Sequence, residues 1–547
     1  MLSYRKLAMR VLGRPLHTGG IDSPRPASQR AAALILTAAM LTTLAVPAFA
    51  DIWYIENGDI TVKAGETKGT NKVSQGANQE VEDTDTIITN REDKASSNTV
   101  TIDAGNDKVE VTLDNVNIKA DSGSALTSKG DVTLTLKGDN HLTGGISDTG
   151  NYGRNGIAST GSLTISGGEN DSLTAQGGSG ADGGHGGHGI YSNGSLTISG
   201  GSTVTANGGN GGNVSGDGIS SNGSVTISGG AVTANGGDCK DGYGGNGISS
   251  SSGVAISGGT VKAAGGNGKD GSGGNGISST STTISGGTVT ANGGSDNSSG
   301  GNGIRSFDVA ISGGTVKAAG GNGGYGGNGI IGSGRVAISG GTVNAAGGDG
   351  GNGKDGGYGI ISRNIDLSGS LELTAKAGSP NGKALSQDGN ELDLNTIKDK
   401  LGPGAKVTAT DANGDSKQVS IPRPVEPEEP VIPGESSSSS DGGSSAPSAP
   451  VSSLPGLTVT DKDGQRISYT NTQSGNTLTV CVGRLTASLR ASLAALRQLR
   501  AEGIETITFQ TILCSTTLSV DELLAMGGED AEAVLTHRLT DSSLTVG

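Results

Sequence analysis

Apolar side chains recur in a short, regular pattern along residues 157–377. An isoleucine preceded by glycine returns every 26 to 33 residues, at Ile157, Ile190, Ile219, Ile248, Ile277, Ile304, Ile330 and Ile360. A second landmark, Ile-Ser-Gly-Gly, follows seven of these isoleucines at an offset of seven or eight residues. A fixed period of this kind is typical of a stacked repeat fold.

Each repeat predicts three short strands and three bends. In residues 218–237 (GISSNGSVTISGGAVTANGG), strands are expected to begin near Ile219, Val225 and Val232. Apolar and small polar residues alternate in the last two, which is the pattern of a strand with one buried face. Asn-Gly and Gly-Gly pairs separate the strands and favour turns. The 3.6-residue period of a helix is absent, and a repeat offers only about five small apolar side chains for burial.

A repeat with so little core cannot fold alone, but stacked repeats would bury these positions as continuous columns. Each strand would pair with its equivalent one coil away, at the spacing of about 4.8 Å between neighbouring strands. The sequence therefore predicts a mainly β fold, a right-handed parallel β-helix with coils of about 26–33 residues, over residues 51–420. Less regular apolar runs in residues 100–142 extend the same solenoid toward the N-terminus.

One polar position of the repeat also predicts a structural feature. The residue two places before the repeated isoleucine is an amide in five repeats, namely Asn155, Asn246, Asn275, Asn302 and Asn328, and it is Asp217 in another. Stacked amides at one register hydrogen-bond along the axis, so we expect an asparagine ladder rather than a ligand site.

The two ends of the chain differ from the repeats. Residues 1–50 combine six basic residues, an apolar run over 31–46 and the sequence PAFA before Asp51, which predicts a cleaved signal peptide. Residues 421–455 are rich in proline, serine and acid, which predicts a disordered linker. Residues 456–547 predict a small α+β domain. In it a helix would carry Leu485, Leu489, Leu493, Leu496 and Leu499 on one face.

Composition and charge narrow the function classes. Glycine is 101 of 547 residues and aromatics are 2%, which excludes a conventional globular core, while the lack of a strict Gly-X-Y period excludes collagen. Without residues 1–50 the chain has 32 basic and 52 acidic residues, a net charge of −20. That charge disfavours nucleic acid and anionic membrane as partners. The three cysteines, Cys239, Cys481 and Cys514, allow at most one internal disulfide, for which Cys481 and Cys514 are candidates within the C-terminal domain.

Several segments resemble a group of exported bacterial β-helix proteins. They are residues 52–62 (IWYIENGDITV), 98–105 (NTVTIDAG), 111–118 (VTLDNVNI) and 132–142 (VTLTLKGDNHL), together with the ISGGTVTANGG repeats. The group includes a carbohydrate-binding domain family whose characterised members bind acidic plant polysaccharide and calcium. The resemblance covers about residues 52–377. It implies the fold and a carbohydrate ligand, and it transfers no individual binding residue.

Acidic residues in the glycine-rich loops are candidate calcium ligands. Asp182, Asp241, Asp270 and Asp296 lie seven or eight residues before their isoleucines. Carboxylates stacked at one register repel one another, and Ca²⁺ would relieve that repulsion because it favours several oxygen ligands. Three loops also contain GGxGxD, as in calcium-binding nonapeptide repeats, although tandem nonapeptides are absent. The alternative is a mobile acidic loop with no ion.

Three tyrosines are candidate sugar contacts. Tyr152, Tyr243 and Tyr325 each lie five residues before the repeated isoleucine, so aligned coils would place them in one row, about 14 Å apart. Sugar rings stack on aromatic faces, and such a row would serve as a sparse polysaccharide platform. The alternative is simple packing of the rings against neighbouring glycines.

Other chemistry has weaker support. His185 and His188 form an HGGH segment that lacks the further ligands of a transition-metal site. A polysaccharide lyase or hydrolase would need clustered or paired carboxylates on the strands, and Asp308, Asp366 and Glu372 have no evident partner at matching register.

The sequence thus predicts a secreted or cell-surface, non-catalytic protein whose solenoid binds an acidic polysaccharide or host glycan with the help of calcium. No membrane insertion is expected after signal cleavage. The alternative is a structural or adhesive surface rod with no glycan ligand in the solenoid, and an enzyme is disfavoured.

Overall fold

The computed structural model describes residues 51–422, apart from 93 and 148–150, and residues 457–546 with short gaps at 462–464, 468, 475, 483, 485, 512–514, 527–531 and 538–541. The chain divides into two compact units, residues 1–427 and 428–547. The predicted signal peptide and nearly all of the predicted linker lie outside the described residues. No helix in the described ranges is long and apolar enough to cross a membrane.

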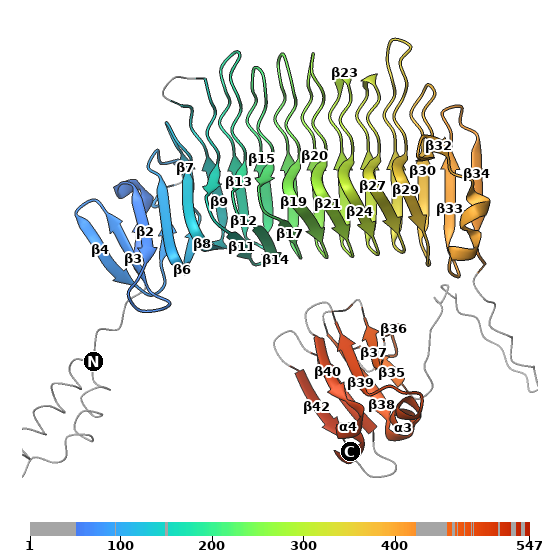
Figure 1. Cartoon of the computed structure of the whole chain (residues 1–547). Coiled ribbons are helices and arrows are strands. Elements are labelled where there is room, and N and C mark those ends of the chain that lie inside the picture. The colour runs from blue at the N-terminus through green and yellow to red at the C-terminus, as the bar shows by residue number, and fades with distance from the viewer. Residues whose placement is uncertain are drawn as a thin grey trace, which may run out of the picture. The chain divides into compact units, whose positions relative to one another are not determined.

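The first unit is the predicted β-solenoid. The repeated isoleucines pair with one another from coil to coil in parallel register, beginning with Ile157 beside Ile190 and ending with Ile330 beside Ile360. The coils therefore stand in a row, as Figure 1 shows. The mainly β prediction is confirmed, with 54% strand and 6% helix among the residues that the structure describes.

Each regular coil contributes to two sheets. The first two predicted strands of a repeat belong to a 20-stranded sheet, and the third belongs to a 12-stranded sheet. The first two are separate strands in the three coils from Ile157 to Ile227, and they merge into one strand from β19 (Ile248–Ile256) onward. Together the two sheets enclose a tube, and register shifts such as the one between Ser250 and Gly253 mark the first predicted turn in the long strands.

The strands of the 20-stranded sheet are β1 (Ile52–Tyr54), β2 (Ile60–Ala64), β3 (Asn71–Gln75), β4 (Asn78–Asp83), β5 (Ile87–Thr89), β6 (Val100–Asp114), β8 (Leu126–Lys137), β10 (Ile157–Ser159), β11 (Leu163–Gly167), β13 (Ile190–Ser192), β14 (Leu196–Gly200), β16 (Ile219–Ser221), β17 (Val225–Ile227), β19, β21 (Ile277–Ile284), β24 (Ile304–Ile311), β27 (Ile330–Ile338), β29 (Ile360–Leu367), β31 (Leu385–Gln387) and β32 (Asn390–Glu391). Those of the 12-stranded sheet are β7 (Asn117–Lys119), β9 (Asp139–Thr143), β12 (Ser172–Gln176), β15 (Thr203–Asn207), β18 (Ala231–Asn235), β20 (Thr260–Ala264), β22 (Thr288–Asn292), β25 (Thr315–Ala319), β28 (Thr342–Ala346), β30 (Glu372–Lys376), β33 (Lys406–Thr410) and β34 (Ser416–Ser420).

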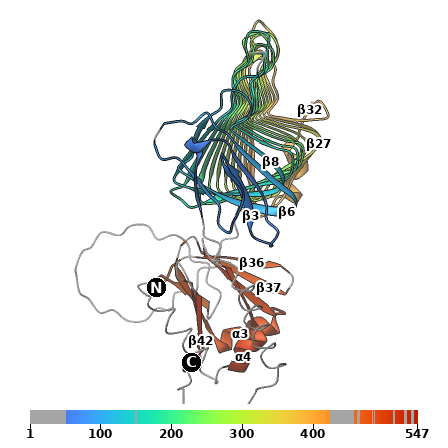
Figure 2. The ribbon, with the colours of Figure 1, turned by 90° about the vertical axis from the view of Figure 1, so that its left-hand side faces the viewer.

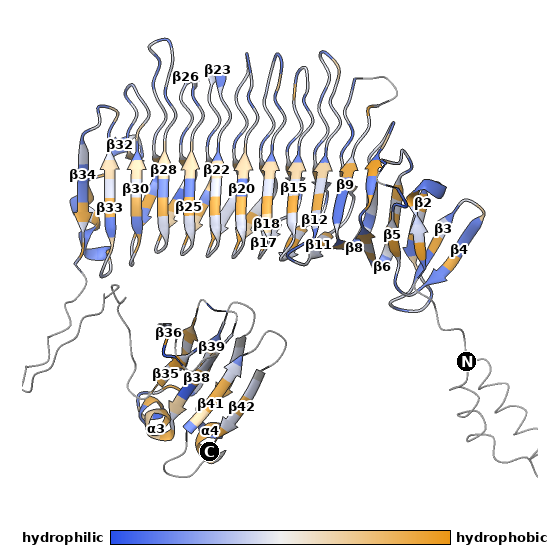
Figure 3. Cartoon of the chain, turned by 180° about the vertical axis from the view of Figure 1, so that it is seen from behind, coloured by the Kyte–Doolittle hydropathy of each residue, from blue (hydrophilic) through white to orange (hydrophobic). Residues whose placement is uncertain are grey.

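The tube is filled by columns of aliphatic side chains. In one coil these are Ile248, Val254, Ile256, Val261 and Ala263, all of them buried. Figure 3, coloured by hydropathy, shows hydrophobic and more polar residues alternating along the strands, as a strand with one buried face requires. Burial of one such larger side chain contributes about 1.5–3 kcal/mol, so the stacked columns stabilise the tube even though each coil is thin.

Antiparallel strands close both ends of the tube. At the N-terminal end β2, β3 and β4 form a meander. At the C-terminal end β31 pairs with β32 and β33 with β34, beside the 3₁₀ helix η2 (Leu394–Lys400). Such caps cover sheet ends that would otherwise pair with another chain.

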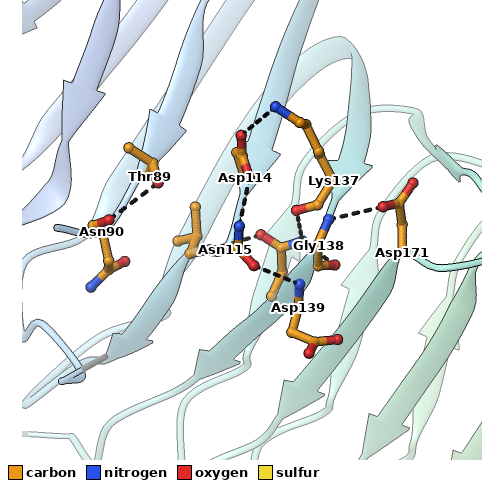
Figure 4. Close-up of polar contacts among 10 residues, drawn as sticks. Thr89, Asn90, Asp114, Asn115, Lys137, Gly138, Asp139 and Asp171 are labelled. Carbon is orange, nitrogen blue, oxygen red and sulfur yellow. Dashed lines mark hydrogen bonds and ion pairs between the residues drawn. The ribbon is translucent and has the colours of Figure 1, made fainter. Parts of the chain in front are cut away.

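Polar side chains hold the corner between the two sheets in the early coils, as drawn in Figure 4. Asn115, at positive φ, accepts from the Asp139 N–H at 3.1 Å, and Asp171 accepts from the Gly138 N–H at 2.9 Å. Lys137 forms an ion pair of 2.8 Å with Asp114. In later coils a Gly-Gly pair makes this corner. Glycine reaches positive φ without side-chain support.

The glycine-rich loops form one ordered layer, which we call the crest. It consists of the residues between each strand of the 12-stranded sheet and the next repeated isoleucine, for example residues 265–276. Figure 1 shows the loops projecting from the same edge of the coils, and the end-on view in Figure 2 shows them superposed in a narrow column. Each loop has an outgoing and a returning limb.

Backbone hydrogen bonds join the limbs of the crest in a continuous zigzag. Gly274 N–H donates to the Gly266 carbonyl in the same loop at 2.9 Å, and Gly266 N–H donates to the Gly245 carbonyl in the preceding loop at 2.8 Å. A Cβ on any of these residues would overlap a neighbouring carbonyl. The crest therefore requires glycine. The zigzag runs through Gly378, Gly357, Gly348, Gly327, Gly321, Gly301, Gly294, Gly274, Gly266, Gly245, Gly237, Gly216, Gly209, Gly187 and Gly178.

The second unit is an α+β domain with its own core. One antiparallel sheet contains β35 (Leu457–Thr460), β38 (Ala487–Ser492), β41 (Glu532–His537) and β42 (Ser542–Val546), and a second sheet contains β36 (Thr470–Ser474), β37 (Thr477–Cys481), β39 (Thr506–Gln510) and β40 (Ser515–Ser519). The helices are α3 (Leu493–Ala501) and α4 (Val520–Met526). Their packing against the strands buries a separate cluster of apolar residues.

The predicted helix of this domain is wrong in its first half. Residues 487–492 form β38, in which Ala487, Leu489 and Ala491 are buried alternately. Ser492 then caps α3 by accepting from the Ala495 N–H at 3.2 Å. Leu489 fits both a helical and a strand pattern, and the sheet pairing decides between them. Cys481 carries a free thiol, and Cys514 lies outside the described residues.

Candidate functional site

Exposed side chains form a row along the crest. Isolated parallel bridges place Tyr152 beside His185, His185 beside Val214, and Val214 beside Tyr243. Each bridge joins one coil to the next, so these four residues share one register. The row is continuous over these four coils, at about 4.8 Å per step.

The same register continues through two serines to the third tyrosine. Gly244 N–H donates to the Ser272 carbonyl and Gly273 N–H to the Ser299 carbonyl, which sets Ser272 next to Tyr243 and Ser299 next to Ser272. Ser299 then pairs with Tyr325. The structure thus places all three predicted tyrosines in one row, three coils apart, with exposed fractions of 50% (Tyr152), 58% (Tyr243) and 51% (Tyr325).

Local contacts orient the rings of the row. Tyr152 packs against His185 with ring centroids 5.3 Å apart, and the ammonium of Lys354 lies 4.7 Å from the centroid of Tyr325. The ring edge of Tyr243 lies close to Gly271, where an added Cβ would be only 3.2 Å from its Cδ1. Each ring therefore rests against the crest on one side and keeps about half of its surface in solvent.

The four predicted acidic residues do not come together. Asp241 and Asp270 occupy the same register in consecutive coils, as the bonds around Cys239 and Tyr243 require. Asp296 lies two positions earlier, beside Gly268, because the loop at residues 293–303 is shorter. The prediction of one shared register is therefore wrong for Asp296.

Lysines neutralise two of these acids at the crest tips. Lys240 lies 3.0 Å from Asp182, and Lys269 lies 3.9 Å from Asp241. Hydrogen bonding to Asp182 raises the pKa of Lys240 above its usual value. Across the described residues no three His, Cys, Asp or Glu side chains gather in a metal-binding group. The repulsion between stacked carboxylates is thus relieved by neighbouring lysines.

The two histidines of the HGGH segment have separate environments. His185 belongs to the tyrosine row, while His188 Nδ1 accepts a hydrogen bond from the Asp217 N–H at 2.9 Å. The ring of His188 also stacks on Tyr191 with centroids 5.7 Å apart. These contacts give each ring a packing role in the crest.

The asparagines form a ladder where the crest meets the tube. In Asn246, Asn275, Asn302 and Asn328 the side-chain amide donates to the Oδ1 of the residue one coil before, at 2.9 to 3.0 Å. Asp217 is the first acceptor of this ladder. Burial raises the pKa of the Asp217 carboxyl, while His188 and the Asn246 donors act in the opposite direction. One coil before His188, the side-chain oxygen of Asn155 accepts a hydrogen bond from the His188 N–H.

Sequence reasoning missed four members of the row, namely His185, Val214, Ser272 and Ser299. His185 and Val214 lie five residues before Ile190 and Ile219, the same offset that identified the tyrosines. Because only aromatic residues were considered at this offset, the sequence did not reveal that the row is continuous. Lys354 was also missed, because no repeat offset links it to Tyr325.

The carboxylates considered for catalysis lie on the outer face of the tube. Asp366 forms ion pairs with Arg335 and Lys400, and the Arg335 hydrogen bond lowers the pKa of its carboxyl. Asp308 accepts from the Arg335 N–H at 2.9 Å. A cavity of about 480 Å³ opens elsewhere, near the N-terminal meander, between Gly65–Thr70 and strand β6. Charged residues of both signs line that cavity, including Glu66, Lys68 and Lys108.

Comparison with protein-family models, with curated proteins and with solved structures found no match for this chain.

Proposed function

We propose that this protein is an exported, non-catalytic carbohydrate-binding β-helix whose crest contacts a polysaccharide. The observation that carries the proposal is the row of three half-exposed tyrosines at one register of the coils. A tyrosine ring offers an apolar face together with a hydroxyl, which suits the faces and the rim of a sugar ring. A periodic row suits a polymer that lies along the solenoid axis.

The residues between the tyrosines support a polar ligand. His185, Ser272 and Ser299 occupy three of the four intervening positions of the row and supply hydrogen-bonding groups, while Val214 occupies the fourth. The ammonium of Lys354 over the Tyr325 ring places a positive charge at the row, which favours an anionic polymer at this point. The resemblance of residues 52–377 to proteins that bind acidic polysaccharide supports the same ligand class, and the predicted signal peptide supports a secreted or cell-surface location.

Retention on an immobilised acidic polysaccharide tests the proposal. Polygalacturonate is a suitable probe, with a neutral glucan as comparison. Replacement of Tyr152, Tyr243 and Tyr325 by alanine should abolish retention of the intact chain, because the stacking faces are lost. Phe307→Ala is the matched control, since Phe307 is 54% exposed but lies outside the row. Unchanged retention of the triple variant, with an unchanged circular dichroism spectrum, would contradict the proposal.

A surface rod with an adhesive C-terminal domain is the second candidate. It is favoured by the separate cores of the two units, which let the solenoid act as a spacer. A glycan array probed separately with residues 51–422 and residues 457–547 distinguishes the two candidates. Binding by the solenoid fragment supports the first function, and binding by the C-terminal fragment alone supports the second. Release of oligosaccharides from polygalacturonate would contradict the non-catalytic assignment.

A further inference from the structure

Asp83 is a buried carboxylate at the N-terminal end of the solenoid. It is the last residue of β4, and it is 0% exposed. Its Oδ2 accepts from the Trp53 indole N–H at 2.9 Å, and its Oδ1 accepts from the backbone N–H groups of Asp85 at 3.1 Å and Asp51 at 3.3 Å. These donors orient the carboxylate, but all three are neutral.

No cationic side chain accompanies this buried charge. None of the ion pairs in the part of the chain that the structure describes includes Asp83. The neighbouring residues Asp51 and Asp85 are exposed and acidic, so they add negative charge to the same segment. Buried charges in proteins are normally paired, because an unpaired one is costly to remove from water.

The predicted cleavage site adjoins this carboxylate. The sequence PAFA before Asp51 predicts cleavage between Ala50 and Asp51. Hydrolysis by a leader peptidase breaks this peptide bond, adds the hydroxyl group of water to the Ala50 carbonyl carbon and adds the remaining proton to the Asp51 nitrogen. The new α-amine then takes up the proton that the new carboxyl group releases, since an α-amino group is mostly protonated at neutral pH. The nitrogen that donates to Asp83 as an amide thus becomes an ammonium.

We propose that removal of the signal peptide creates an ion pair between the α-ammonium of Asp51 and the buried carboxylate of Asp83, and that this pair stabilises the N-terminal cap of the solenoid. An ammonium carries a full positive charge and three protons, so it offsets the buried negative charge and forms a shorter hydrogen bond than an amide. The inference rests on the predicted cleavage site and is independent of glycan binding.

The pair acts on a weakly held strand at the end of the tube. Strand β1 follows Asp51 directly, has only three residues and pairs with β5 in parallel register. The Asp51 carbonyl takes part in this pairing by accepting from the Ile87 N–H at 3.4 Å. Asp83 connects this short strand to β4, the last strand of the meander. A fixed first residue therefore joins two parts of the cap, and the cap opens more readily in the uncleaved chain.

Two forms of the protein test the proposal. One is residues 51–547, with a free amine on Asp51, and the other is residues 47–547, which keeps PAFA and leaves an amide at Asp51. Trp53, the one tryptophan of the chain, reports on the site by fluorescence. The form that begins at Asp51 should melt at a higher temperature by this signal. The amides of β1 and β4 should also exchange about fivefold more slowly in that form, because hydrogen bonds between charged groups are the stronger ones.

Asp83→Asn in both forms identifies the partner of the ammonium. The amide keeps the shape of the side chain and one acceptor oxygen but loses the charge, so the difference between the two forms should disappear. Asp85→Asn is the matched control, because the side chain of Asp85 is exposed and this residue reaches Asp83 through its backbone N–H. The difference between the two forms should persist in this control.

Three outcomes would overturn the proposal. Equal melting temperatures and equal exchange in the two unmodified forms would show that the ammonium does not stabilise the cap. A difference that persists in Asp83→Asn would assign the effect to the extra residues of the longer form. A first residue other than Asp51, found by mass spectrometry of the exported protein, would remove the required group. The comparison of the two unmodified forms needs no substitution, and polysaccharide retention is a separate measurement, so this proposal and the proposed function fail separately.

Discussion

The tube and the crest are built from the same coils but are held together differently. In the tube, side chains such as Ile277 and Val289 fill the space between the sheets. In the crest, the limbs touch through their backbones, and the zigzag of glycine N–H and C=O groups takes the place of a side-chain core. Coils with one shared spacing therefore form two kinds of interior. The tube depends on the volume of its apolar side chains, whereas the crest depends on having no side chains between its limbs.

The two interiors differ in what they tolerate. The tube gains stability from each methylene group it buries, at about 0.8 kcal/mol each. The crest gains about 0.5–1.5 kcal/mol from each hydrogen bond, and it must offset the greater chain entropy that glycine loses on folding, about 0.5–1 kcal/mol per residue relative to alanine. A smaller side chain should therefore damage the tube, and a larger one should damage the crest.

The largest effect is expected in the tube. Ile277→Ala should lower the free energy of unfolding by about 2–5 kcal/mol, because Ile277 is fully buried and its removal leaves a cavity. Chemical denaturation measures the change in the free energy of unfolding, and hydrogen exchange shows which regions lose protection. Thr283→Ala on the same strand is the control, since the neighbouring coils already carry Ala255 and Ala310 at that register. Equal effects of the two changes would refute a core that rests on aliphatic columns.

The next effect separates the crest from the tube. Gly274→Ala should cost about 1–3 kcal/mol, because its Cβ would overlap the Gly245 carbonyl and break the zigzag. Loss of amide protection should be centred on the crest loops and spare the strands. Gly253→Ala in β19 is the matched glycine change, since the nearest atom to its Cβ would be 3.2 Å away. If Gly274→Ala and Gly253→Ala lower the free energy of unfolding equally little, the crest does not depend on glycine.

The same contrast explains what the sequence could and could not predict. The tube was predictable because alternating apolar residues, fixed to the offsets of Ile219 and its equivalents, define both strands and register. The tyrosine row followed from one such offset. The crest was not predictable as an ordered layer, because glycine carries no apolar or polar pattern to read. The displaced position of Asp296 depends on loop length, which sets backbone pairing and leaves no periodic signal.

The ladder at the junction of tube and crest gives the smallest of the three effects, and it depends on pH. Burial raises the pKa of Asp217 in the folded chain above its unfolded value, so the folded state binds this proton more tightly. The stabilising contribution is then fully present below the unfolded value of about 3.9 and is lost as the pH rises through the higher folded value. Other carboxylates, such as Asp366 with its lowered pKa, change stability in the opposite direction.

Asp217→Asn isolates this contribution. The amide removes the titration, and its Oδ1 can still accept from the Asn246 side chain as Asp217 does. Melting temperatures measured from pH 3.5 to 7.5 should therefore show a gain of the variant over the unmodified chain that grows as the pH rises. Asn302→Ala, which interrupts the ladder without changing charge, should give a loss that does not vary with pH. A gain for Asp217→Asn that is constant across the series would mean that the junction tolerates the buried carboxylate without a proton.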